Sequence, residues 1–195
     1  RFASQLEFNV EKRVQEAMAT MSGEINRITR ERIQAELNKL LCGAAPERGI
    51  DLLVETGLME HIYPEISALK AEGDEHHQHK DIYQHSLTVL RQAIDQEEDG
   101  PDLVLRWAAL THDIGKPATK KILPDGQVTF HQHDVVGAKL ARKRLRALKY
   151  PKQEIRDISQ LIYLHMRFYG FPDGDWTDSA VRRYVSDAGP LLPRL

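Results

Sequence analysis

The segment from Thr111 to Pro117 constrains this chain most, because it places a His-Asp pair at the end of an apolar run. The apolar run over 103–110 predicts a buried helix that ends at His112 and Asp113, with a glycine and a lysine close behind. Burying an imidazole and a carboxylate without partners is costly. Two explanations fit: a helix C-terminus with the histidine near the dipole and the aspartate in the turn, or a metal ion bound by both groups.

Three further histidines on other predicted helices favour the metal ion. His85 lies near the apolar face of a predicted helix that Asp81 caps. His133 starts another predicted helix, and His165 ends the apolar segment 158–164. Each of these histidines alone fits an ordinary core or surface position. Because each lies near a helix end or an apolar face, we expect them to converge on the His-Asp pair.

The order of these residues resembles the HD phosphohydrolase superfamily, whose pattern is H…HD…H…H…D. The chain supplies the first five positions with His85, His112, Asp113, His133 and His165. The central motif HDIGK and the Gly-Ala pair four residues after the third histidine make the match specific. The last aspartate is the departure, because Asp178 and Asp187 lack its usual surroundings. We expect it to lie beyond Leu195, so that the HD domain here is incomplete at its C-terminal end.

The resemblance implies metal-dependent hydrolysis of phosphate esters. His85, His112 and Asp113 would hold one divalent ion, while His133 and His165 would assist a second ion or bind phosphate. Imidazole and carboxylate ligands suit Mn, Ni, Co, Zn or Fe better than Ca, and Mg is a further candidate. The identity of the ion stays open.

Two residues are expected to act directly in catalysis. A bound ion would lower the pKa of a water molecule from about 16 toward about 7. Asp113 would orient that water, and Lys116 would stabilise negative charge on the phosphoryl oxygens.

The first part of the chain resembles the neck and body of bacterial tRNA nucleotidyltransferases and poly(A) polymerases. Periodicity alone predicts a small array of amphipathic helices, one capped by Thr29 and another begun by Pro46. The resemblance rests on three sequence motifs: RFASQLEF from residue 1, ITRERIQAELNKLL from residue 28, and ETGL from residue 55 followed by PE at 64–65.

Together the two resemblances predict an all-α chain, with a helical neck and body over 1–73 and the HD domain over 74–195. The polar segment 70–79 marks the boundary. One exception is a small β-hairpin around the turn Pro124-Asp125-Gly126. The nucleotide-transfer head of the family, with its carboxylate pair, is missing. We therefore expect a fragment that does not add nucleotides.

The resemblance suggests that the HD domain removes 2′,3′-cyclic or terminal phosphates at RNA 3′ ends, with tRNA as the expected partner. A catalytically silent HD scaffold that holds tRNA for the missing head is the alternative. A third possibility is an HD enzyme that hydrolyses nucleotides, but such an enzyme would not account for the three motifs of the neck and body.

Charge and composition limit the kinds of binding partner that this chain can have. The net charge of −2 argues against a general polyanion binder, but positive charge gathers over 139–152, where acidic residues are absent. This run is either a solvated helix face or an RNA contact. The RNA-binding candidates are Arg142, Lys143, Arg146 and Lys149, and Tyr150 and the pair Phe168-Tyr169 are candidates for base stacking. One cysteine, no apolar run long enough for a membrane span and no visible signal peptide suit a cytoplasmic protein.

Overall fold

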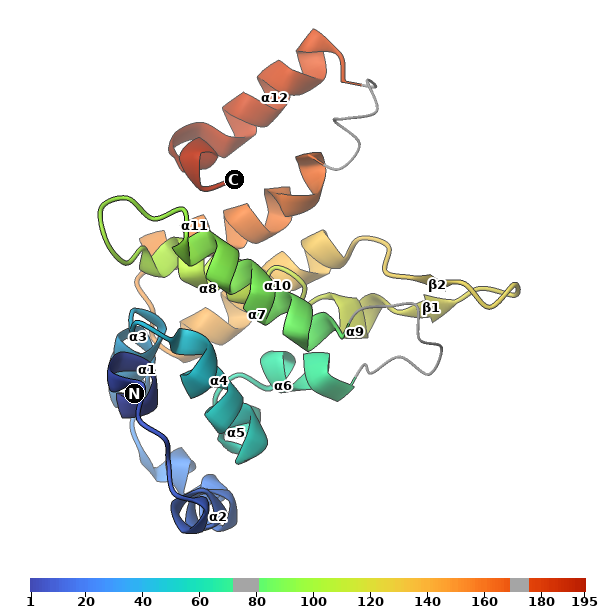
Figure 1. Ribbon diagram of the computed structural model, residues 1–195. Coiled ribbons are helices and arrows are strands. Elements are labelled where there is room, and N and C mark those ends of the chain that lie inside the picture. The colour runs from blue at the N-terminus through green and yellow to red at the C-terminus, as the bar shows by residue number, and fades with distance from the viewer. Residues whose placement is uncertain (72–80, 169–175) are drawn as a thin grey trace.

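The computed structural model describes residues 1–71, 81–168 and 176–195, and it confirms the predicted all-α class (Figure 1). The first part contains six α-helices and a 3-10 helix in the described residues. These are α1 (Phe2–Leu6), α2 (Lys12–Thr20), η1 (Ser22–Arg27), α3 (Arg30–Leu41), α4 (Pro46–Glu55), α5 (Leu58–Ile62) and α6 (Pro64–Ala71).

The second part adds helices and the predicted hairpin. Its described elements are α7 (Ile82–Ile94), α8 (Leu103–Thr111), α9 (Lys116–Thr119), β1 (Lys121–Ile122), β2 (Val128–Thr129), α10 (His133–Ala147), α11 (Lys152–Leu164), η2 (His165–Phe168), α12 (Asp178–Ala188) and η4 (Gly189–Arg194). The strands pair antiparallel, with Lys121 opposite Thr129. The hairpin projects from the molecule between α9 and α10 (Figure 1).

Several helix boundaries follow the local chemistry of the sequence. The Asp81 carboxylate accepts hydrogen bonds from the backbone N–H groups two and three residues later, at 2.9 and 3.3 Å, and so caps α7 as predicted. Thr29 directly precedes α3, but its side chain forms no capping hydrogen bond, so that predicted cap is wrong. Pro46 is the first residue of α4. Gly57 adopts φ = 72° just after that helix, a backbone conformation that glycine tolerates without strain.

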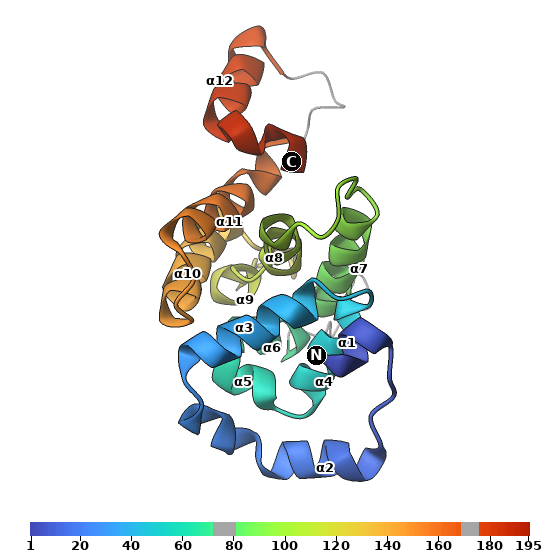
Figure 2. The ribbon, with the colours of Figure 1, turned by 90° about the vertical axis from the view of Figure 1, so that its left-hand side faces the viewer.

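Four helices form the framework of the second part. α10 and α11 lie side by side, α11 packs against α8, and α8 packs against α7 (Figures 1 and 2). α12 packs on the end of α11 through Leu164, Tyr184 and Ala188. By contrast, α2 lies at the edge of the molecule, with every residue exposed or half-buried (Figure 2). Among the described residues, no helix has the length and apolar character needed to cross a membrane.

One continuous hydrophobic core joins the two parts of the chain. It runs from Ile33 in α3 to Leu191 in η4. Near its middle, the Trp107 ring stacks on Tyr63 at 5.7 Å between centroids and meets Tyr150 edge-on at 5.9 Å. The predicted boundary between residues 73 and 74 lies outside the described residues.

Tyr150 is therefore a core residue, and the expectation that it stacks on RNA bases is wrong. It is 5% exposed, and its hydroxyl accepts a hydrogen bond from Trp107 Nε1 at 3.1 Å and donates one to Asn38 Oδ1 at 2.7 Å. The other stacking candidates, Phe168 and Tyr169, have side chains outside the described part of the chain.

A buried arginine fixes α8 against the end of α3. Arg106 is 4% exposed, and its guanidinium donates to the carbonyl oxygens of Leu41 and Gly43 at 2.7 and 2.9 Å. It also forms two hydrogen bonds with the Glu97 carboxylate, at 2.6 and 2.8 Å. A buried charge needs such compensation, and here the compensation anchors the helix that ends at the His-Asp pair.

Candidate metal centre

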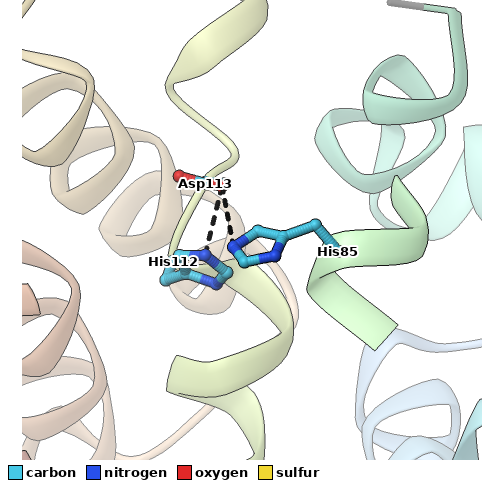
Figure 3. A group of neighbouring side chains, drawn as sticks. All are labelled: His85, His112 and Asp113. Carbon is cyan, nitrogen blue, oxygen red and sulfur yellow. Dashed lines mark ion pairs between the residues drawn. The ribbon is translucent and has the colours of Figure 1, made fainter. Parts of the chain in front are cut away.

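The side chains predicted to act together come from separate helices and meet at one place. His85 lies in the first turn of α7, and His112 and Asp113 follow α8. Figure 3 shows these three residues, with the two imidazoles directed toward the carboxylate. His133 begins α10, and His165 follows α11.

The Asp113 carboxylate is the centre of this cluster and is 1% exposed. Its Oδ2 atom lies 2.7 Å from Lys116 Nζ, 3.1 Å from His112 Nε2 and 3.9 Å from His85 Nε2. His85 is the most open of these side chains, at 40% exposure.

The other carboxylate oxygen faces two further imidazoles. Asp113 Oδ1 lies 3.2 Å from His133 Nε2 and 3.9 Å from His165 Nε2. The two Nε2 atoms lie 3.2 Å from each other. Asp113 thus belongs to two groups of potential metal ligands, and within each group the ligand atoms lie within 4.8 Å of one another.

The other nitrogen of three imidazoles is fixed by a backbone carbonyl. The Nδ1 atoms of His112, His133 and His165 each lie within hydrogen-bond distance of the carbonyl oxygen three residues earlier, in Ala109, Phe130 and Ile162. A carbonyl oxygen only accepts, so each Nδ1 must donate. In the neutral rings the Nε2 atoms are then acceptors.

This arrangement directs acceptor atoms toward a common space. The Nε2 atoms of His133 and His165 face each other and the Asp113 oxygen, so a cation between them would relieve the repulsion of their lone pairs. Imidazole nitrogen and carboxylate oxygen are common ligands of transition metals, and backbone carbonyls that orient the far ring nitrogen are typical of such sites. The residues present therefore fit a divalent ion.

The pKa values in the cluster follow from burial and close contacts. Burial alone would raise the pKa of Asp113, but His112 and His133, whenever their Nε2 atoms carry a proton, together with the Lys116 ammonium outweigh burial and hold this pKa well below its ordinary value. Burial is the main cause that lowers the pKa of His165 to about 4. At neutral pH, Asp113 is thus ionised and His165 is neutral, which are the forms that bind metal.

Two glycines allow the elements of the cluster to approach. A Cβ atom added to Gly115 would lie 2.0 Å from the carbonyl oxygen of His133 and 2.7 Å from the backbone nitrogen of Gly137. A Cβ atom on Gly137 would lie 3.3 Å from the Gly115 nitrogen. The turn after the His-Asp pair therefore rests directly on the start of α10, which brings His133 to Asp113.

Lys116 lies inside the cluster, as its position in the motif suggests. Its nearest partner is Asp113, which is itself a candidate metal ligand. Its ammonium donates to Asp113 Oδ2, and its side chain is 22% exposed. The sequence-based prediction for Lys116 was a contact with phosphoryl oxygens, and it did not include this ion pair. The three-residue spacing on a tight turn could have indicated it.

The four RNA-binding candidates lie on α10 or just after it, and all four are exposed. Arg142 Nε donates to Ser159 Oγ on α11 at 2.9 Å, which fixes the direction of that side chain. Arg144, in the same basic run, is instead paired with Glu65 through two hydrogen bonds of 2.9 and 3.0 Å. Arg144 therefore has a structural role, whereas the four candidates remain exposed to solvent.

Two family models match the chain. The model described as "HD domain" matches residues 82–186, which contain the whole cluster. The model described as "Probable RNA and SrmB- binding site of polymerase A" matches residues 7–70.

Several known proteins are similar to the chain. The A-adding tRNA nucleotidyltransferase of Deinococcus radiodurans is 33% identical over 100% of this chain and 45% of its own length. The CC-adding tRNA nucleotidyltransferase of Thermus thermophilus is 31% identical with the same coverage. The multifunctional CCA protein of Haemophilus influenzae is 32% identical over 77% of this chain and 37% of its own length. The chain thus spans less than half the length of these relatives.

Proposed function

Because the chain belongs to the HD domain family, we propose that its His-Asp cluster binds divalent metal ions and hydrolyses phosphate esters. One observation carries the proposal: the imidazoles of His112, His133 and His165 donate Nδ1 to backbone carbonyls and direct Nε2 toward the buried Asp113. Acceptor nitrogens that are oriented in this way around a carboxylate are typical of a metal site, and less typical of polar side chains that are buried without a ligand.

The roles of the residues follow from their positions. His85, His112 and Asp113 would hold one ion, and Asp113 with His133 and His165 would hold another. A bound ion supplies a Lewis acid and activates water near neutral pH. Asp113 would orient the reacting water, and the ammonium of Lys116 would contact the phosphoryl oxygens.

The proposed substrates are phosphates at RNA 3′ ends. Supporting this, relatives are named as tRNA nucleotidyltransferases, and residues 7–70 match a model whose description includes RNA binding. With a 2′,3′-cyclic phosphate, water would form a new P–O bond, one ribose P–O bond would break, and the ribose oxygen would take the proton. The product is a phosphate monoester, which the same centre could hydrolyse further. We propose that tRNA is the natural partner.

The function is tested with the purified chain and RNA oligonucleotides that end in a 2′,3′-cyclic phosphate or a 3′-phosphate. We expect turnover that needs added Mn²⁺ or Ni²⁺ and stops with a chelator, measured by mass spectrometry of the products. Oligonucleotides with a free 3′-hydroxyl serve as the control. Tight tRNA binding without turnover under any metal condition would contradict hydrolysis and identify a silent scaffold.

We further propose that the exposed cations of α10 contact the RNA backbone. The segment 7–70 has more acidic than basic residues, and several of its cations are paired with neighbouring glutamates, as in Arg27–Glu24 and Lys39–Glu36. In α10, by contrast, Asp134 is the acidic residue, and among the described residues no carboxylate lies within ion-pair distance of Arg142, Lys143 or Arg146. Phosphates would meet fewer competing carboxylates on α10.

Replacing Arg142, Lys143 and Arg146 together by glutamine is expected to flatten the salt dependence of tRNA binding. Each phosphate contact contributes about −0.7 to −0.9 to the log–log slope of affinity against salt, so the slope should change by roughly two to three units. Fluorescence anisotropy at several salt concentrations measures this. The matched control replaces the exposed Lys121, Arg182 and Arg183 by glutamine, which removes the same charge outside both α10 and the segment 7–70. Equal slopes in the α10 variant and the unmodified chain would leave α10 as a solvated face.

A further inference from the structure

Lys116 contacts one oxygen of Asp113 and thereby makes the two ligand groups unequal. Its ammonium lies 2.7 Å from Oδ2, the oxygen shared with His85 and His112. The same ammonium lies 5.6 Å from the centre of the Phe130 ring, which covers it on another side. A positive charge is therefore held in a half-buried position beside the first ligand group.

The shared oxygen limits how far a bound ion can lie from this charge. Metal–oxygen distances are about 2.0–2.2 Å, and the ammonium lies 2.7 Å from the same oxygen. An ion on Asp113 Oδ2 would therefore lie within about 5 Å of Lys116 Nζ. Screening is weak at such a half-buried position, so the repulsion between the two cations is substantial.

We propose that Lys116 weakens the binding of a divalent ion at His85, His112 and Asp113, so that the affinity of this group is set by a charge inside the site. The inference rests on the proposed function, because it concerns the same metal centre. It assigns Lys116 a role in ion binding in addition to its proposed contact with phosphate.

The same contact could have the opposite effect. A donor that holds a ligand carboxylate in place strengthens metal binding, and its loss typically costs about 10- to 100-fold in affinity. The two effects differ in sign, and two variants separate them. Lys116→Gln removes the charge but keeps a hydrogen-bond donor, whereas Lys116→Met removes both.

The test is isothermal titration of the purified chain with Mn²⁺ in a buffer without phosphate. We expect Lys116→Gln to bind the ion at least about tenfold more tightly than the unmodified chain, a change of about 1.4 kcal/mol. Lys116→Met should also bind more tightly, by a smaller factor if the hydrogen bond contributes. Lys121→Met, an exposed position on β1, controls for the loss of one distant positive charge and should leave the affinity within twofold.

Unchanged or weaker Mn²⁺ binding by Lys116→Gln would overturn the inference and leave Lys116 as an orienting donor or a phosphate contact. If the unmodified chain binds Mn²⁺ and the variants do not differ from it, the proposed metal centre stands and this inference alone fails. If neither the unmodified chain nor the Lys116 variants bind Mn²⁺, Ni²⁺ or Zn²⁺, the proposed function and this inference fail together. Circular dichroism spectra check that each variant is folded.

Discussion

Replacing Asp113 by asparagine is expected to abolish metal-dependent phosphate release from RNA 3′ ends. Asp113 is the shared member of both ligand groups, with one oxygen directed to each. Loss of a supporting hydrogen bond in a metal site costs up to about 100-fold, so loss of the shared ligand should cost more than this. The measurement is the initial rate with Mn²⁺ or Ni²⁺ for the unmodified chain and the variant.

Asparagine is chosen because it keeps the shape of the side chain. Alanine would also leave Lys116 and the surrounding imidazoles beside a small cavity, which would mix a loss of stability with a loss of function. Asp125→Asn, in the exposed turn of the hairpin, is the matched control and should keep full activity. Turnover by Asp113→Asn at the unmodified rate, with the ion present, would refute a metal mechanism at this cluster.

The second large effect is expected at Gly115, where alanine should destabilise the fold. The added Cβ atom would lie 2.0 Å from the His133 carbonyl oxygen, a separation that requires backbone atoms to move. Overpacking in a well-packed interior costs about 1–3 kcal/mol and more where the backbone must shift, so we expect about 3 kcal/mol or more. Urea denaturation followed by circular dichroism measures the free energy of unfolding.

The displacement should also disturb the site, because the same contact places His133 beside Asp113. We therefore expect Gly115→Ala to weaken Mn²⁺ binding as well as folding. Gly23→Ala is the matched control, since a Cβ atom there meets no described heavy atom within 4 Å, and it should change stability by less than about 0.5 kcal/mol. A Gly115→Ala chain as stable as Gly23→Ala would contradict the close packing of the turn on α10.

Much of the fold follows from signals that are local in the sequence. The Asp81 carboxylate, the proline at position 46 and the Pro124-Asp125-Gly126 turn each act on backbone groups a few residues away. Their effects can be read without knowing the tertiary structure. The gathering of the site histidines was predictable for a related reason, because each lies at a helix end or on an apolar face that must turn inward.

Other features depend on contacts between distant segments and could not be predicted from local pattern. Tyr150 is an aromatic residue in a basic run, and only its packing against Trp107 and its bond to Asn38 show that it belongs to the core. Arg144 resembles its neighbours in the sequence, yet Glu65, from α6, withdraws it from the exposed basic face.

The glycine and the lysine of the HDIGK motif have structural roles that hydrophobic periodicity does not predict. The glycine of HDIGK has φ = −80°, which other residues also adopt, so its backbone conformation does not require glycine. What requires it is the approach of α10, which lies about twenty residues later in the chain. The hydrogen bond from Lys116 to Asp113 likewise depends on the tight turn between α8 and α9.

The most direct test of the metal centre is anomalous diffraction from crystals of this chain equilibrated with Mn²⁺, recorded on the low- and high-energy sides of the manganese absorption edge. We predict a peak that appears only above the edge, with an Asp113 carboxylate oxygen and at least two imidazole Nε2 atoms within about 2.0–2.3 Å. Well-ordered His85, His112, Asp113, His133 and His165 side chains without such a peak among them would contradict the account.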